Sequence, residues 1–360
     1  MEPNYPSNPS PYVRAEIIDA PRPIPRHRGP GLMVGCLLPL LILGLGGSIL
    51  VNVILFAGLP SFDSGSRVEE RHFSHNRHAA NKIAIISVEG TILEGRGFVK
   101  RQIEHARKDD DVKAIVLRVN SPGGTVTGSD DIYHYLTQMA SERGIPMVVS
   151  MGGIAASGGY YVSMAVGPRA DSIFAEPTTW TGSIGVVMPH FNVAQLMEDW
   201  GVQSDSVVSK PLKGMGSYTR PMTQEERRIF QALVDDSFAG FKEVIRRGRP
   251  KFKADPAALD RIATGQVFTA QQAQQNGLVD KIGYVEDAVT QAIQFAGLSP
   301  DEVNVVQYRP EFSLTDVFMD TTSDGSAKTR GLGLDALAEL TVPRAYYLCT
   351  WLPPLVSTTK

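Results

Sequence analysis

The first pattern along the chain is a long apolar segment, residues 31–62, that contains no charged residue. A helix that crosses a bilayer needs about 20 apolar residues, and this segment is longer. Three arginines precede it within ten residues, and mixed charges follow it. The excess of positive charge marks the cytoplasmic side. We therefore predict one transmembrane helix over residues 31–60, with a cytoplasmic N-terminus and the rest of the chain on the outer face of an inner or plasma membrane.

The segments on either side of this helix are polar. Residues 1–30 contain eight prolines, which predicts a disordered cytoplasmic tail. Residues 61–80 contain His72, His75 and His78, and we interpret them as a polar linker rather than a metal site. A cleaved signal peptide is the alternative to the anchor. Its apolar region would be only about 7–15 residues long and followed by an A-x-A site, which is not evident here.

From residue 82 onward, β-branched runs alternate with amphipathic stretches. This order predicts βαβ units with a parallel sheet. We assign residues 81–300 to one such domain and residues 301–360 to a C-terminal extension, whose segment 336–355 is apolar enough to dock on the protein. The expected strands cover 82–88, 113–119, 146–151 and 184–188; the expected helices cover 97–108, 129–143, a capped helix from Thr223, 270–276 and 285–296.

Composition narrows the classes of function. The 35 Lys and Arg residues against 38 Asp and Glu give a formal net charge of −3, which argues against a nucleic-acid partner. Two cysteines exclude a disulfide scaffold and do not indicate a metal cluster. The 34 glycines and 24 prolines suit a turn-rich α/β protein. We expect neither a metal nor a cofactor.

Three glycine-rich turns lie next to the second, third and fourth predicted strands. The first two follow their strands, and the third overlaps the start of its strand. They occupy residues 120–124, 152–159 and 181–185. Paired glycines allow backbone N–H groups to approach a substrate oxygen closely. Ser157 lies within the second turn, where it is either a nucleophile or a small residue that lets a helix pack on the sheet. None of the turns matches a phosphate-binding loop.

A serine nucleophile needs a general base, and the residues alone leave two kinds open. Among the histidines outside the linker, His105 and His134 lie on predicted helices, whereas His190 follows a strand and is the best histidine candidate. Lys210 and Lys213 lie in a glycine-containing stretch, SKPLKGMGS, just before the helix that starts near Thr223.

Five motifs in a fixed order make the chain resemble the signal peptide peptidase A (SppA) family. They are SPGG, AASGGYY, TGSIGVV, LKGMGSYTRPMTQEER and GQVFTAQQAQQNGLVDKIG, spread over about residues 82–300. The resemblance implies a ClpP/crotonase-like α/β fold of stacked βαβ units and a membrane-attached serine protease. It also implies peptide substrates, such as remnant signal peptides, and a homo-oligomeric ring.

The resemblance assigns roles to individual residues. Ser157 is the implied nucleophile, Lys213 the implied general base, and Ser183 the implied partner that orients the lysine amine. Backbone N–H groups of the oxyanion hole are expected from Gly123, Gly124 and Gly158. In related enzymes the serine and the lysine come from neighbouring subunits, which makes self-assembly necessary for this single-copy chain.

The sequence departs from the family pattern around the lysine. Gly214 stands where the family usually has Asp or Asn, and the usual K-S-G before the lysine is altered, so Lys210 stays an alternative base. A lysine pKa must fall from about 10.4 to about 7, or roughly 4.6 kcal/mol, to supply a neutral amine. Burial lowers a lysine pKa. The neighbours Pro211, Leu212 and Met215 predict apolar surroundings for Lys213.

Two other functions fit parts of the same pattern. A crotonase-type acyl-CoA enzyme shares the oxyanion turns, but it has no use for a serine–lysine pair or a membrane anchor. A non-catalytic membrane scaffold of the same fold would not need Ser157, Lys213 or Ser183. Tyr160 and Tyr161 follow the candidate nucleophile, and we expect them to pack behind it rather than to line the substrate pocket.

Overall fold

The computed structural model describes residues 68–311 and 345–348, together with the single residues Leu45 and Ser48. The chain divides into two units, residues 1–64 and 65–360. The predicted cytoplasmic tail (1–30) and nearly all of the predicted transmembrane segment (31–60) lie outside the described residues. Within the described part, no helix combines the length and the apolar character needed to cross a bilayer.

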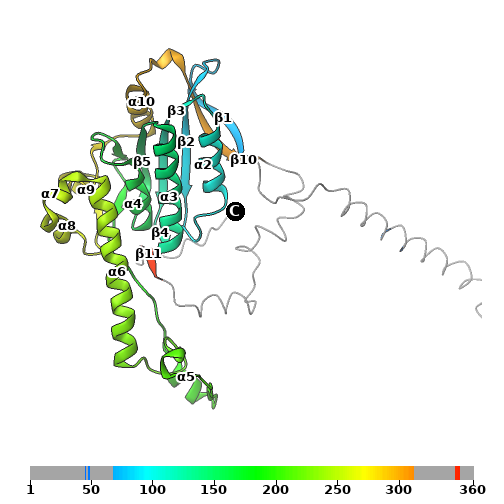
Figure 1. The fold of residues 1–360 in the computed structure, drawn as a ribbon, viewed down its shortest axis with the longest axis vertical. Helices are drawn as coiled ribbons and strands as arrows, with labels where there is room; N and C mark the ends of the chain where they lie inside the picture. The colour runs from blue at the N-terminus through cyan, green and yellow to red at the C-terminus, as the bar shows by residue number, and fades with distance from the viewer. Residues whose placement is uncertain (1–44, 46–47, 49–67, 312–344, 349–360) are drawn as a thin grey trace, which may run out of the picture. The chain divides into compact units, whose positions relative to one another are not determined.

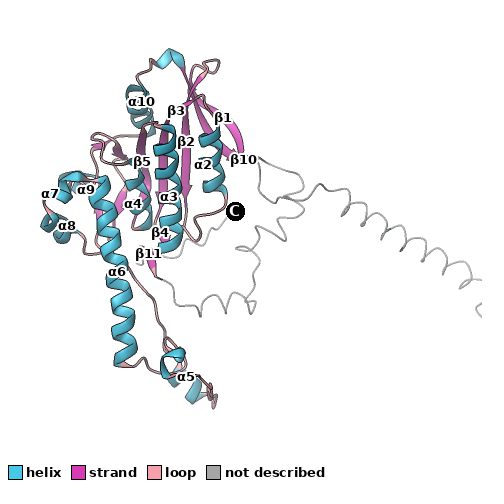
Figure 2. Cartoon of the chain, in the orientation of Figure 1, coloured by secondary structure: helices cyan, strands magenta, loops and turns pink. Residues whose placement is uncertain are grey.

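The core of the second unit is a large, mainly parallel sheet (Figures 1 and 2). Its main path runs β1-β10-β2-β3-β5-β6-β9, and all neighbours pair in parallel except β1 with β10. The strands are β1 (Val68–His75), β2 (Asn81–Glu89), β3 (Val112–Ser121), β5 (Met147–Ala156), β6 (Ile173–Ala175), β9 (Lys281–Ile282) and β10 (Val303–Pro310).

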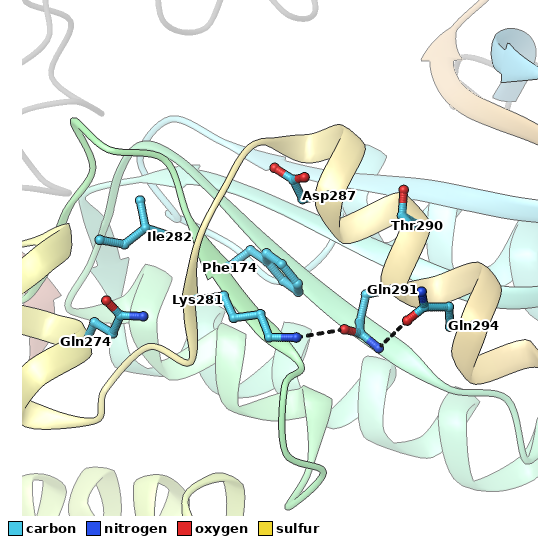
Figure 3. A pocket seen from close by; sticks show the side chains of 8 residues that line it. All are labelled: Phe174, Gln274, Lys281, Ile282, Asp287, Thr290, Gln291 and Gln294. Carbon is cyan, nitrogen blue, oxygen red and sulfur yellow. Dashed lines mark hydrogen bonds between the residues drawn. The ribbon is translucent and has the colours of Figure 1, made fainter.

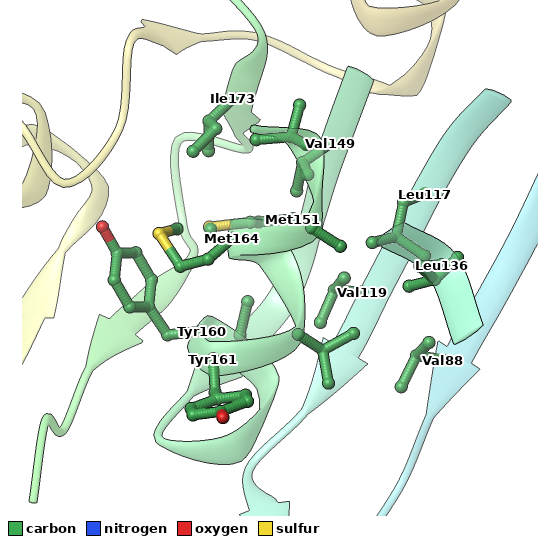
Figure 4. Packing of buried hydrophobic residues seen from close by; sticks show 14 of the residues in the cluster. Val88, Leu117, Val119, Leu136, Val149, Met151, Tyr160, Tyr161, Met164 and Ile173 are labelled. Carbon is green, nitrogen blue, oxygen red and sulfur yellow. The ribbon is translucent and has the colours of Figure 1, made fainter. Parts of the chain in front are cut away.

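Helices cover both faces of this sheet. On one face, α2 and α3 pack with α4 and α6 against a cluster that includes Leu117, Val119 and Met151 (Figure 4). On the other face, α10 packs on Ile83, Ile85 and their neighbours. The helices are α2 (Phe98–Lys108), α3 (Val126–Arg143), α4 (Gly158–Ser163), α5 (Ala194–Asp199), α6 (Gln224–Gly248), α7 (Pro250–Ala254), α8 (Pro256–Ile262), α9 (Ala270–Asn276) and α10 (Val285–Ala296).

The first three predicted strands are confirmed as β2, β3 and β5, and the predicted helices as α2, α3, α6, α9 and α10. Strands with both faces covered carry continuous apolar runs, which is why these segments could be identified. The capping box that starts α6 is present, since the Thr223 hydroxyl accepts from the Glu226 N–H. Gly277, at φ 72°, ends α9 in the left-handed conformation, as glycine does at many helix C-termini.

The sheet extends beyond both predicted limits of the domain, residues 81 and 300. Eight residues of the predicted polar linker (61–80) form β1, and the start of the predicted extension (301–360) forms β10. β10 lies between β1 and β2, so both of its edges are hydrogen-bonded and β1 is the edge strand. Burial of Val303, Val305 and Tyr308 holds β10 in place.

The fourth predicted strand, residues 184–188, was placed wrongly. Extended pairing occurs earlier, in β7 (Trp180–Gly182), which pairs with β5 and with β8 (Val267–Thr269). Gly182 and Ser183 both have positive φ, at 85° and 51°, which ends the strand and turns the chain. Of the predicted strand residues, only Val187 forms a β-bridge, with Tyr346.

The segment between β7 and α6 projects away from the sheet. The N-terminal half of α6 extends beyond the sheet in Figure 1, with α5 beside its far end. This projection, residues 189–222, exposes a set of apolar side chains that includes Trp200, which is 79% exposed. The other exposed apolar members are Phe191, Leu196, Val202, Val207, Val208 and Leu212.

Candidate active site

Ser157 lies at the junction between β5 and α4, at the carboxyl end of a central strand. Its φ of 55° and ψ of −115° are strained for a residue with a side chain, at a cost of about 1–3 kcal/mol. Strain of this kind is concentrated at functional sites, and a similar strand-to-helix turn exposes the serine nucleophile of other hydrolases. Ser157 is 1% exposed, and its hydroxyl oxygen has no hydrogen-bond partner among the described residues.

The glycines predicted to bind the oxyanion lie next to Ser157. Gly158 is the first residue of α4, so its N–H has no acceptor within the helix. A methyl group on Gly158 would lie 3.2 Å from the Gly124 nitrogen, so the two backbone N–H groups are neighbours. The Gly123 N–H instead donates to the Ser121 hydroxyl, at 3.1 Å. Gly124 and Gly158 are therefore the better-placed donors of the three.

Ser183 also belongs to this cluster. The Ser157 N–H donates to the Gly182 carbonyl at 2.8 Å, which places Ser183 beside the Ser157 backbone. Ser183 is buried and held by its own N–H bond to the Gln266 carbonyl, at 2.7 Å. The structure thus brings Ser157, Ser183 and the glycine turn together from three separate parts of the sequence.

Lys213 does not join this cluster within one chain. It lies in a short 3-10 turn, Pro211–Gly214, at the projecting side of α6, and it is exposed. Lys210, the alternative base, is exposed directly before this turn, and its carbonyl accepts the Lys213 N–H at 2.9 Å. Leu212 is 42% exposed, so the apolar surroundings expected for Lys213 are absent among the described residues of a single chain.

An ion pair fixes the turn that follows the lysines. Arg220 donates to both carboxylate oxygens of Glu226 and, at 2.9 Å, to the Gly214 carbonyl. The Arg220 guanidinium, with the Thr223 backbone N–H, lowers the pKa of Glu226 to about 2. The carboxylate therefore stays ionised down to acidic pH, and the lysine turn is tied to the start of α6.

The histidines do not supply a base to Ser157 within the described chain. His105 bonds to Glu70 at 2.8 Å, and His134 contacts the Tyr135 ring. His190, the best histidine candidate, stacks on Tyr218 with 5.2 Å between ring centroids, in a groove between residues 186–190 and α6. Since the Ser157 hydroxyl has no partner in the described residues, none of these rings bonds to it.

The two tyrosines that follow Ser157 are both buried. Tyr160 is fully buried and donates to the Leu278 carbonyl at 2.9 Å, which is the packing role expected for it. The Tyr161 hydroxyl donates to Asp130 at 2.7 Å, but its ring lies against Phe241 and Tyr347. Tyr161 is 5% exposed and belongs to the buried hydrophobic cluster, so it also packs as expected. Its neighbours Phe241 and Tyr347 come from distant segments, so these contacts have no local signal in the sequence.

A separate polar pocket lies at the other side of the sheet, between β9 and α10 (Figure 3). There Lys281 donates to Gln291 at 3.1 Å, and Gln291 in turn to Gln294. None of the residues predicted for catalysis lines this pocket. Over residues 68–311 and 345–348, the structure contains no group of three or more His, Cys, Asp or Glu side chains that could hold a metal ion.

Comparisons with known proteins agree with this arrangement. Residues 139–299 match the model of peptidase family S49, and residues 71–183 match that of the Clp protease family. The chain is 38% identical to Protease 4 of Salmonella typhi over 247 residues, which cover 66% of this chain and 38% of that protein.

Two further relatives are nearer to this chain in length. A candidate protease of Synechocystis, slr0021, is 39% identical over 62% of this chain and 78% of its own length. A candidate signal peptide peptidase SppA of Enterococcus faecium is 34% identical over 63% of this chain and 67% of its own length. Together with the buried serine at a glycine-rich strand end, these matches show that the chain belongs to peptidase family S49, a family of serine proteases, and has a ClpP-like α/β domain.

Proposed function

We propose that this protein is a membrane-anchored serine endopeptidase that cleaves remnant signal peptides and other short polypeptides through a Ser157–Lys213 dyad. The observation that carries the proposal is Ser157 itself. Its backbone is strained, and its hydroxyl is buried without a partner among the described residues, beside the Gly124 and Gly158 backbone. A buried hydroxyl without a partner is costly, so it is retained where it has a function.

Each chemical step has a group to perform it. Neutral Lys213 takes the proton of Ser157 as the hydroxyl oxygen attacks the substrate carbonyl carbon. The N–H groups of Gly124 and Gly158 stabilise the oxyanion. The lysine ammonium then protonates the leaving amine, and water hydrolyses the acyl-enzyme. Ser183 lies where it can hold the lysine amine in line with Ser157.

The base has to come from a second copy of the chain. Lys213 is exposed on a projection that also exposes Trp200, Leu196 and other apolar side chains. Exposed apolar patches of this kind mark protein interfaces. Docking on a neighbouring subunit would bury these side chains and desolvate the amine, which lowers a lysine pKa. A homo-oligomeric ring therefore supplies both the lysine and its apolar surroundings.

Hydrolysis of a fluorogenic peptide by the full-length chain in detergent tests the proposal. We expect turnover by the wild type and none by Ser157→Ala. Turnover that survives Ser157→Ala would contradict a serine mechanism. Purification of the chain with a bound acyl-CoA and without peptidase activity would instead favour the crotonase-type alternative.

Replacing Ser183 by glycine is expected to lower the activity and to leave the stability almost unchanged. Glycine accepts the φ of 51° more readily than serine, so stability should change by less than about 1 kcal/mol. Loss of the hydroxyl that orients the lysine should lower kcat about 10- to 100-fold with little change in KM. Thermal unfolding and steady-state kinetics measure the two effects. Unchanged kcat in a folded Ser183→Gly chain would remove Ser183 from the mechanism.

The N-terminal segment is expected to hold the protein on the membrane. Residues 31–62 lack charge over a length that spans a bilayer, and they precede the described domain. After cell lysis the full chain should sediment with membranes and resist extraction by carbonate, whereas a chain without residues 1–66 should stay in the supernatant. Equal partitioning of the two chains would contradict the anchor.

A further inference from the structure

The turn that carries Lys213 is linked to α6 by an arginine side chain. Residues 201–213 are all exposed, so packing against the rest of the described chain does not fix this stretch. The backbone hydrogen bonds of the turn stay within residues 210–217, at 2.9 to 3.3 Å. The Arg220 guanidinium makes the link to α6. It donates at 2.9 Å to the carbonyl of Gly214, the residue that follows Lys213 directly.

The arginine is in turn held by Glu226, in the first turn of α6. Glu226 is 2% exposed, and its carboxylate accepts from both terminal nitrogens of Arg220 and, at 2.9 Å, from the Thr223 N–H. A buried carboxylate is costly unless it is paired, and paired bonds to both of its oxygens fix the orientation of a guanidinium. The same planar group therefore reaches Glu226 and the Gly214 carbonyl at once.

The helix that carries Glu226 is fixed in the core at its other end. Apart from Glu226, the buried residues of α6 all lie near its C-terminus: Phe241, Val244, Ile245 and Gly248. A helix of 25 residues is about 37 Å long at 1.5 Å per residue, and its N-terminal half extends beyond the sheet (Figure 1). The core of a subunit thus sets the position of its lysine turn through α6, Glu226 and Arg220.

From these contacts we propose that Arg220 and Glu226 are positioning residues, which hold Lys213 of one subunit where it can take the proton of Ser157 in the neighbouring subunit. The inference rests on the proposed serine–lysine mechanism, and neither side chain takes part in a chemical step. A displacement of about 1 Å in a catalytic group can cost about 100-fold in rate. Loss of the guanidinium should therefore lower kcat and leave KM nearly unchanged, because the substrate binds beside the serine.

Arg220→Gln tests this role in the full-length enzyme with a fluorogenic peptide. The start of α6 should survive the change, since Glu226 keeps its bond to the Thr223 N–H. We expect kcat to fall about 10- to 100-fold and KM to stay within about threefold. Arg220→Lys should recover only part of the loss, because an ammonium lacks the planar fork of donors.

Arg228→Gln is the matched control. Arg228 is exposed on the same helix, and its side chain donates at 3.4 Å to the Gln224 carbonyl of its own helix turn. This variant should keep the kcat of the wild type. Thermal unfolding and the size of the assembled ring are measured for each variant, and both should match the wild type.

Mixed rings show which subunit needs the arginine. The reference mixture combines Ser157→Ala chains, which supply the lysine, with Lys213→Ala chains, which supply the serine. Arg220→Gln in the lysine-supplying chain should lower activity about 10- to 100-fold below the reference. The same change in the serine-supplying chain should not lower it, whereas a general structural role would lower both mixtures.

The outcomes separate this inference from the proposed function. Equal activity of the two Arg220→Gln mixtures would overturn the positioning role and leave the serine protease standing. An inactive reference mixture, from an active wild type, would overturn the shared dyad and this inference with it. Absence of peptide cleavage by the wild type would overturn the proposed function itself.

Discussion

Mixing two inactive variants of this protein is expected to restore peptidase activity. Ser157→Ala and Lys213→Ala should each lower kcat/KM by about 10⁴-fold or more, because each removes one member of a unit that works together. In a mixed ring, a Lys213→Ala chain supplies the serine and a Ser157→Ala chain supplies the lysine. Random assembly of equal amounts makes about a quarter of the sites complete. Activity should therefore return to roughly that fraction of the wild type.

We expect this result because Ser157 and Lys213 do not come together within one chain. The Ser157 hydroxyl is buried without a partner among the described residues, whereas Lys213 is exposed on the projection. The mixture is made by co-expression, and activity is measured on a fluorogenic peptide. A Ser157→Ala chain mixed with a Ser157→Ala/Lys213→Ala chain is the control and should stay inactive. Mixed rings that form but do not hydrolyse the peptide would contradict a dyad that is shared between subunits. Full activity of Lys213→Ala, with loss in Lys210→Ala, would transfer the role to Lys210.

Replacing Gly124 by alanine is expected to abolish activity and to weaken the fold. The added methyl group would lie 1.8 Å from the Ile92 carbonyl oxygen, a distance that backbone atoms cannot accept. That carbonyl accepts the Thr125 N–H at 2.7 Å, so relief of the clash has to shift the short strand β4 (Gly123–Thr125) and the hydrogen bond together. We expect a loss of about 3 kcal/mol in the free energy of unfolding. Movement of an oxyanion donor should also cost about 10²- to 10³-fold in kcat.

Gly153→Ala is the matched control for this variant. Gly153 lies within β5, is exposed, and has only an Asn120 side-chain oxygen, at 3.7 Å, near a new methyl group. Its stability and kcat should stay close to those of the wild type. Denaturant unfolding and steady-state kinetics on both variants check the prediction. A Gly124→Ala chain with normal stability and normal kcat would show that β4 does not form the oxyanion site.

Local patterns predicted the centre of the fold but not its borders. The runs 82–88, 113–119 and 146–151 are apolar on both faces, because helices cover both sides of the sheet, and this signal identified β2, β3 and β5. β1 and β10 pair across more than 200 residues of sequence, so neither polar β1 nor short β10 carries a local signal of its partner. The strand expected at 184–188 failed because Ser183 turns the chain before an otherwise apolar run.

The candidate site was likewise predicted only in part. Ser157, Ser183 and the glycine turns were located from residue type and position, because each follows the end of a strand in one sheet. The aromatic cluster of Tyr161, Phe241 and Tyr347 could not be derived, since its members come from α4, α6 and a C-terminal segment that share no motif. Lys213 is exposed in the described chain, and in the proposed mechanism its surroundings come from a neighbouring molecule, which the pattern of one chain does not describe.

The position of β10 between β1 and β2 has a consequence for biosynthesis. A ribosome makes β1 and β2 early, but the strand that separates them comes more than 200 residues later. Until then the edge of β2 offers unpaired N–H and C=O groups, which invite association with other chains. The sheet closes only when nearly the whole polypeptide has been made. A translation product that ends before β10 therefore cannot complete the sheet, and we expect it to be inactive as a protease.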